Sequence, residues 1–128
     1  MTNCNTNVIA AMKKCGVRKL VVMAALGAGD SFPSLSFPLR CLFRKSNMAA
    51  SFEDHDVVDR IVKESGMDFV LVRPARLTDE DAKAVKEYGD QGKGIGLMSA
   101  ISRRSVAVFL VASVEKSTWD GKSPVISN

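Results

Sequence analysis

Hydrophobic residues along this chain follow two patterns: a helical spacing in some segments and an unbroken apolar run in others. In residues 55–64 branched apolar side chains recur at helical spacing and share one face: Val57, Val58, Ile61 and Val62. Charged residues, Asp59 among them, are expected on the other faces. Gly66 is suited to end this helix in a left-handed conformation. Residues 69–72 are then apolar without alternation, as in a strand buried on both faces. The pattern predicts a helix packed on a parallel sheet.

A second helix and strand of the same kind come earlier in the chain. We expect a helix capped by Asn5 or Thr6 and ended by Gly16. The run 20–26 that follows is again apolar on both faces, which favours a second parallel strand. A second parallel strand makes an α/β sheet covered by helices the expected architecture.

The remaining elements are predicted from local signals. We expect a short helix from Thr78 to Tyr88, a glycine-rich loop over 89–96 and a short strand at 97–101. Ser102 should cap a helix whose apolar face is formed by Val106, Phe109, Leu110 and Val114. The last strand is expected at 124–127. All these elements fit one domain over residues 1–128.

Two turns follow the predicted parallel strands, at the edge where open α/β sheets bind ligands. Pro74 ends one strand because it has no N–H to donate. After the other, residues 27–29 supply only two of the three glycines of a dinucleotide fingerprint, and Phe32 stands at the third position. A loop over a ligand cleft is therefore favoured over a pyrophosphate cradle. Residues 32–48 are expected to fold over this edge as a lid or to serve a partner.

Composition and charge narrow the classes of partner. The net charge of +4 comes from scattered basic pairs with few aromatic residues, which makes a nucleic-acid platform a weak candidate and suits a small anionic ligand such as a nucleotide. No segment has the ~20 apolar residues of a membrane helix. The three cysteines show no metal or redox spacing, so we expect reduced thiols, no metal site and a cytoplasmic protein.

Three segments together resemble a known family: HDVVDRIVKESGMDFVLVRPARLTD, AAMKKCGVRKLVVMAALGAGDS and ISRRSVAVFLV. The chain resembles the NAD(P)-binding, NmrA-like atypical short-chain dehydrogenase group, which has biliverdin-reductase-B-like and flavin-reductase-like members. The resemblance implies the carboxyl-terminal half of a Rossmann-like, doubly wound parallel sheet. It also implies that the first βαβ unit, with its glycine-rich turn, is lacking, so NADP or NAD binding should be weak.

The resemblance also implies site residues. Expected on the cofactor side are Ala24, Ala25, Leu26, His55, Arg73, Pro74 and Ala75, and on the substrate side Gly27, Gly29, Arg76 and Arg103. Alanines stand where the family places a Ser or Thr, and His55 stands where short-chain dehydrogenases have the lysine of Y-x-x-x-K. Thus His55 is the candidate ribose donor or general acid, and its alternative is a surface histidine among Glu53, Asp54 and Asp56.

Two functions follow as expectations. The first is the nicotinamide and substrate half of an NAD(P)H-dependent reductase, acting on a small-molecule substrate. The second is a catalytically silent, truncated or regulatory NAD(P)-binding-like protein. In the family's sheet the strand at 20–25 would have one unpaired edge here, and we expect homodimerisation, aggregation or marginal stability through that edge.

Overall fold

The computed structural model describes residues 2–29, 31, 49–96 and 98–128, and for residues 49–52 it describes the backbone. The helices are α1 (Thr2–Lys14), α3 (Ala49–Glu64) and α4 (Arg103–Glu115). The strands are β1 (Lys19–Met23), β2 (Asp68–Pro74), β3 (Arg76–Thr78), β4 (Lys86–Glu87), β5 (Ala100–Ser102) and β6 (Val125–Ser127). The expected lid at 32–48 lies outside the described residues.

The two runs of uninterrupted apolar residues form neighbouring parallel strands, as predicted, although β1 ends at Met23 and does not extend to residue 26. β1 and β2 pair in register from Lys19 opposite Asp68 to Met23 opposite Val72. Within the described residues the main sheet has the order β1-β2-β6-β4, in which β6 is parallel to β2 and β4 is antiparallel to β6. Most of this sheet is therefore parallel, which confirms the expected Rossmann-like class.

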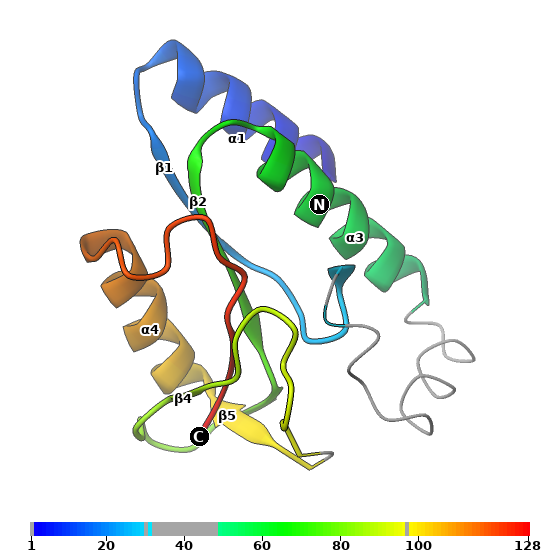
Figure 1. Ribbon diagram of the computed structural model, residues 1–128, viewed down its shortest axis with the longest axis vertical. Helices are drawn as coiled ribbons and strands as arrows, with labels where there is room; N and C mark the ends of the chain where they lie inside the picture. Colours follow the sequence, from blue (N-terminus) through cyan, green and yellow to red (C-terminus); the bar gives the residue numbers. More distant parts are fainter. Residues whose placement is uncertain (1, 30, 32–48, 97) are drawn as a thin grey trace.

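Helices cover both faces of the sheet, and β2 lies between two hydrophobic clusters. Figure 1 shows α1 and α3 side by side on one side of β1 and β2, and α4 on the other. Alternate residues of β2 enter the two clusters: Leu71 packs with Val58 and Val62 of α3, whereas Val70 and Val72 pack with Phe109 of α4. Burying one such side chain contributes about 1.5–3 kcal/mol, so these contacts hold the layers together.

Both helix-ending glycines were identified correctly, but one helix start was not. Gly16 and Gly66 have the left-handed φ values of 71° and 72° that the pattern predicts. The cap expected at Asn5 or Thr6 is wrong, because α1 already begins at Thr2. The Thr2 amide donates to Asp54 Oδ1 of α3 at 3.1 Å, and this partner lies 52 residues away. A long-range carboxylate thus serves the start of α1, which no local pattern could indicate.

The helix expected from Thr78 to Tyr88 does not form, and this prediction is wrong; residues 78–88 are all described by the structure. They form β3, an extended segment and the short strand β4. β3 pairs in parallel with β5, and Lys83 donates through its amide to Ser105 Oγ at 2.9 Å and accepts from the same hydroxyl through its carbonyl. These long-range hydrogen bonds outweigh the local preference for a helix.

The final helix follows its prediction at the start and departs from it at the end. Ser102 is the N-cap, and its hydroxyl accepts from the Ser105 amide at 3.1 Å. Val106 and Phe109 are buried as expected. Val114 is 60% exposed, so its assignment to the buried face is wrong.

β1 is less enclosed than its sequence predicts. Leu20 is buried, but Met23 is 46% exposed, and β1 is an outer strand of the described sheet. Burial on both faces is therefore confirmed for β2 and wrong for the far end of β1. Among the described residues no helix is both long and apolar enough to cross a bilayer.

Candidate functional site

The segments that leave β1 and β2 run beside each other at the carboxyl edge of the sheet. The Ala24 amide donates to the Val72 carbonyl at 2.7 Å, and the Leu26 amide donates to the Pro74 carbonyl at 3.4 Å. The structure thus brings together five of the predicted cofactor-side residues: Ala24, Ala25, Leu26, Pro74 and Ala75. Ala24, Pro74 and Ala75 are buried, and the other two are half-buried. Three of the five residues are alanines, so a ligand can approach the backbone closely here, although the amides of Ala24, Leu26 and Ala75 already donate to neighbouring strands.

The loop that follows β1 is closed by its own hydrogen bonds. We call residues 27–29 and Ser31 the β1 loop. The Gly27 amide donates to Ser31 Oγ at 2.9 Å, and that hydroxyl donates to the Ala28 carbonyl at 2.8 Å. Gly27 and Gly29 both have positive φ values, 94° and 53°. The Gly29 amide donates to Asp56 Oδ1 of α3 at 2.6 Å, which anchors the β1 loop to that helix.

The Arg73 side chain is engaged inside the protein. It is fully buried, and its Nη2 donates to Asp59 Oδ1 of α3 at 2.5 Å. Nη1 donates to the Asp90 carbonyl at 2.7 Å, in the turn after β4. A cofactor contact by Arg73 stays a prediction, and its guanidinium already joins α3 to that turn.

Asp59 was placed on the wrong face of its helix by the sequence pattern. It is 5% exposed, lies between the buried residues Val58 and Val62 along the chain, and also binds Lys63 Nζ through Oδ2 at 2.8 Å. The only available signal was an acid next to the apolar face, one helical turn from other apolar positions. The sequence could not indicate that the Asp90 carbonyl accepts from Arg73, since every residue type has a backbone carbonyl.

His55 lies on α3 one turn before Asp59 and next to Asp56, which binds the β1 loop. It is half-buried, and its Nδ1 is buried without a hydrogen-bond partner among the described residues. Burying a ring nitrogen without a partner is costly, so we expect a buried water molecule to bind this atom, and a ligand would meet only the exposed part of the ring. His55 is therefore on the helix that borders the candidate edge, and its role stays a prediction.

The two predicted substrate-side arginines lie at a separate pair of strands, one at the start of β3 and the other at the start of α4, directly after β5. Arg76 begins β3 and is exposed, and Arg103 follows β5, the strand that pairs with β3. Arg103 forms an exposed ion pair with Asp79, with 2.6 Å between Nη1 and Oδ1. Nearby, the hydrogen bond from Lys83 lowers the pKa of Glu80 below its ordinary value. This region is polar, solvated and balanced in charge.

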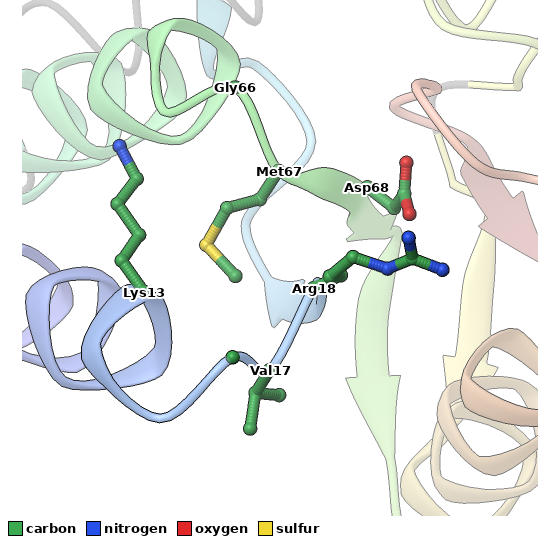
Figure 2. A pocket seen from close by; sticks show the side chains of 7 residues that line it. Lys13, Val17, Arg18, Gly66, Met67 and Asp68 are labelled. Atoms are coloured by element: carbon green, nitrogen blue, oxygen red, sulfur yellow. The ribbon is translucent and has the colours of Figure 1, made fainter.

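Hollows lie at two different edges of the part of the chain that the structure describes. The first, of about 390 Å³, lies at the amino ends of β1 and β2 and is lined by Lys13, Gly16, Val17, Arg18, Gly66, Met67 and Asp68. Figure 2 shows the Met67 side chain between Lys13 and Arg18 in this hollow. Since open α/β sheets bind ligands at the other edge, we give the first hollow no part in cofactor binding.

The second hollow, of about 460 Å³, is lined by Tyr88, Gly89, Asp90, Gln91 and Lys93. It lies beside the turn whose Asp90 carbonyl accepts from Arg73. The Tyr88 hydroxyl accepts from Ser127 Oγ at 3.2 Å, at the end of β6. No cluster of three or more metal-ligating side chains occurs in the part of the chain that the structure describes.

Comparisons with solved structures agree on the fold. ChuY from Escherichia coli CFT073 matches with a TM-score of 0.79 and 19% identity, over 98% of this chain and 64% of that one. ChuY from E. coli O157:H7, described as an anaerobillin reductase, matches with 0.77 and 18%, over 96% and 56%. A short-chain dehydrogenase/reductase from Veillonella parvula DSM 2008, in complex with NADP, matches with 0.81 and 12%, over 99% and 58%. This chain therefore spans between half and two thirds of these proteins.

The sequence comparisons are more specific about the family. No curated protein is similar enough to count as a relative. The family model described as NAD(P)H-binding matches residues 2–117, which is most of the 128 residues. The chain is a member of the NAD(P)H-binding family.

Proposed function

We propose that this chain supplies the nicotinamide and substrate half of an NAD(P)H-dependent reductase. The observation that carries the proposal is the pairing of two segment exits, Ala24–Leu26 and Pro74–Ala75, at the carboxyl edge of a parallel sheet. Ligands of open α/β folds bind at such an edge. Membership of the NAD(P)H-binding family and a fold shared with an NADP complex support a nicotinamide nucleotide as the ligand.

The residues at this edge fit one end of such a nucleotide. The small side chains of the alanines and glycines let a nucleotide lie close to the backbone, and His55 is a half-buried polar side chain on α3, next to the Asp56 that binds the β1 loop. We assign His55 to a ribose hydroxyl, or to proton delivery at the substrate. The residues of this chain would bind and orient, while a bound nicotinamide supplies the hydride.

The chain offers few contacts to the pyrophosphate of such a nucleotide. The 128 residues contain no G-x-x-G-x-x-G turn, whose backbone donors and helix dipole hold a pyrophosphate. We therefore expect a dissociation constant of about 0.1–1 mM for NADPH with the 128-residue chain. The choice between NADPH and NADH would be read from the same titration run with each nucleotide.

A catalytically silent, regulatory NAD(P)-binding-like protein is the second candidate. It is favoured by Ala24 and Ala25, because a methyl group cannot donate the proton or hydrogen bond that a hydroxyl would. The two functions differ in turnover. A reductase oxidises bound NADPH when an acceptor is added, with flavin mononucleotide and biliverdin as first choices by family resemblance. A silent protein binds NADPH and leaves it unchanged.

Calorimetric titration with NADPH tests the proposal and locates the site. His55→Ala should weaken binding about tenfold, the loss of ~1.4 kcal/mol expected for one hydrogen bond to ribose. Lys13→Ala is the matched control, because Lys13 lines the amino-edge hollow where a cation could attract phosphate. Weakening by Lys13→Ala with unchanged affinity for His55→Ala would contradict the site. No binding at several millimolar NADPH would contradict autonomous cofactor binding.

A homodimer through β1 and a cytoplasmic location complete the proposal. β1 is an outer strand of the described sheet and ends in the exposed Met23, so its edge can pair with a second copy.

Cys4 and Cys15 are exposed free thiols, which fits a reducing compartment.

A further inference from the structure

Arg73 occupies a position that a strand normally gives to a hydrophobic residue. β2 is buried from Val70 onward, and Arg73 continues that run with 0% exposure. Its two terminal nitrogens diverge, one to the Asp59 carboxylate of α3 and one to the Asp90 carbonyl. A planar guanidinium fixes the directions of both hydrogen bonds, which a flexible ammonium does not. Arg73 therefore sets the spacing of two segments that flank the carboxyl edge.

The β1 loop packs directly on this ion pair. A Cβ atom added to Gly29 would lie 2.7 Å from Asp59 Oδ2 and 2.8 Å from Arg73 Nη2. Real side-chain carbons essentially never come so close, so only a glycine allows this approach. The Gly29 backbone rests on the Arg73–Asp59 pair on one side and on Asp56 through its amide on the other.

A buried ion pair adds little to the free energy of unfolding compared with a well-packed apolar pair. Replacing such a pair by apolar side chains of similar volume is often neutral or stabilising, because both charges must be removed from water. What the pair adds is a defined geometry. Here that geometry is shared by α3, the β1 loop and the Asp90 turn.

We propose that Arg73 is a positioning residue, whose buried guanidinium, paired with Asp59, holds the β1 loop in the conformation that borders the nucleotide. The proposal rests on the proposed function, since a nucleotide at this edge gives the positioning its purpose. The positioning itself is a property of the protein without ligand and can be measured separately.

The test compares the double variant Arg73→Met/Asp59→Leu with Arg73→Lys by amide hydrogen exchange. The double variant removes both charges at similar volume and should stay folded, with unchanged protection in α4. Amides of Gly27, Ala28 and Ser31 should exchange about tenfold faster or more, because their loop has lost its support. Arg73→Lys keeps the positive charge but loses the planar guanidinium with its two fixed hydrogen-bond directions. It should therefore show the same loss of exchange protection at the same three amides. NADPH affinity should fall in parallel in both variants.

Arg104→Gln is the matched control, since Arg104 forms an exposed pair with Asp81. It should leave the exchange of the β1 loop unchanged. If the double variant does not fold, Arg73→Lys alone decides. Wild-type protection of the loop amides in a folded variant would overturn the positioning role and show the pair to be structural only. If the wild-type chain fails to bind NADPH, the proposed function fails, while the exchange experiment still tests Arg73.

Discussion

Gly29 lies against Asp59 so closely that a single added carbon would stand 2.7 Å from the Asp59 carboxylate oxygen. We therefore expect Gly29→Ala to displace the β1 loop and destabilise the fold. Gly16→Ala is the control, because Gly16 has a similar left-handed φ but nothing within 4 Å of the added carbon. Gly16→Ala should cost about 1–2 kcal/mol of unfolding free energy, the cost of a left-handed non-glycine residue. Gly29→Ala should cost clearly more in urea unfolding, and equal costs would contradict the close contact.

Removing one partner of the buried pair should be severe. Asp59→Ala leaves the Arg73 guanidinium buried without its carboxylate, so the free energy of unfolding should fall by about 3–5 kcal/mol. Asp81→Ala removes one partner of the exposed pair with Arg104 and should cost at most about 1 kcal/mol. Both are measured by urea unfolding at neutral pH. A similar small effect for the two variants would show that the Arg73–Asp59 pair is not as buried as described.

The Ser105 side chain connects α4 to the extended segment before β4 through hydrogen bonds. Its hydroxyl accepts from the Lys83 amide at 2.9 Å and from Asn128 Nδ2 at 2.8 Å. Ser105→Ala should cost about 1–3 kcal/mol, because partly buried donors lose their partner. Ser117→Ala, at an exposed position after α4, is the control and should be near neutral. An unaffected Ser105→Ala would show that the segment is held by other contacts.

The outer edge of β1 should govern self-association. Val21→Pro in the middle of β1 removes a backbone donor, and it would disturb pairing with β2 as well. Met23→Lys is the cleaner change, because Met23 is 46% exposed and a charged residue at an outer strand opposes strand pairing. Sedimentation velocity should show dimers or larger species for the wild type and a shift toward monomer for Met23→Lys. A monodisperse wild-type monomer would contradict the proposed homodimer.

Local sequence signals were enough for the parallel pair at the centre of the fold. Unalternating apolar runs located β1 and β2, and Gly16 and Gly66 located the helix ends, because these features depend on neighbours in the chain. The helix expected at 78–88 failed because Ser105 and β5 hold that segment from a distance. At the site, the edge was foreseeable from Pro74, whereas the partnership of Arg73 with Asp59 was not. That contact links a strand to a helix face that the pattern had assigned to solvent.

The proposed function requires that a nicotinamide nucleotide bind where β1 and β2 end. The most direct measurement is a set of backbone amide NMR spectra recorded while NADPH is added to the 128-residue chain. We expect the largest shift changes at residues 24–29, His55 and Ala75, with residues 13–18 and 66–68 of the amino-edge hollow unchanged. Shift changes confined to the hollow, or no changes at several millimolar NADPH, would contradict the account.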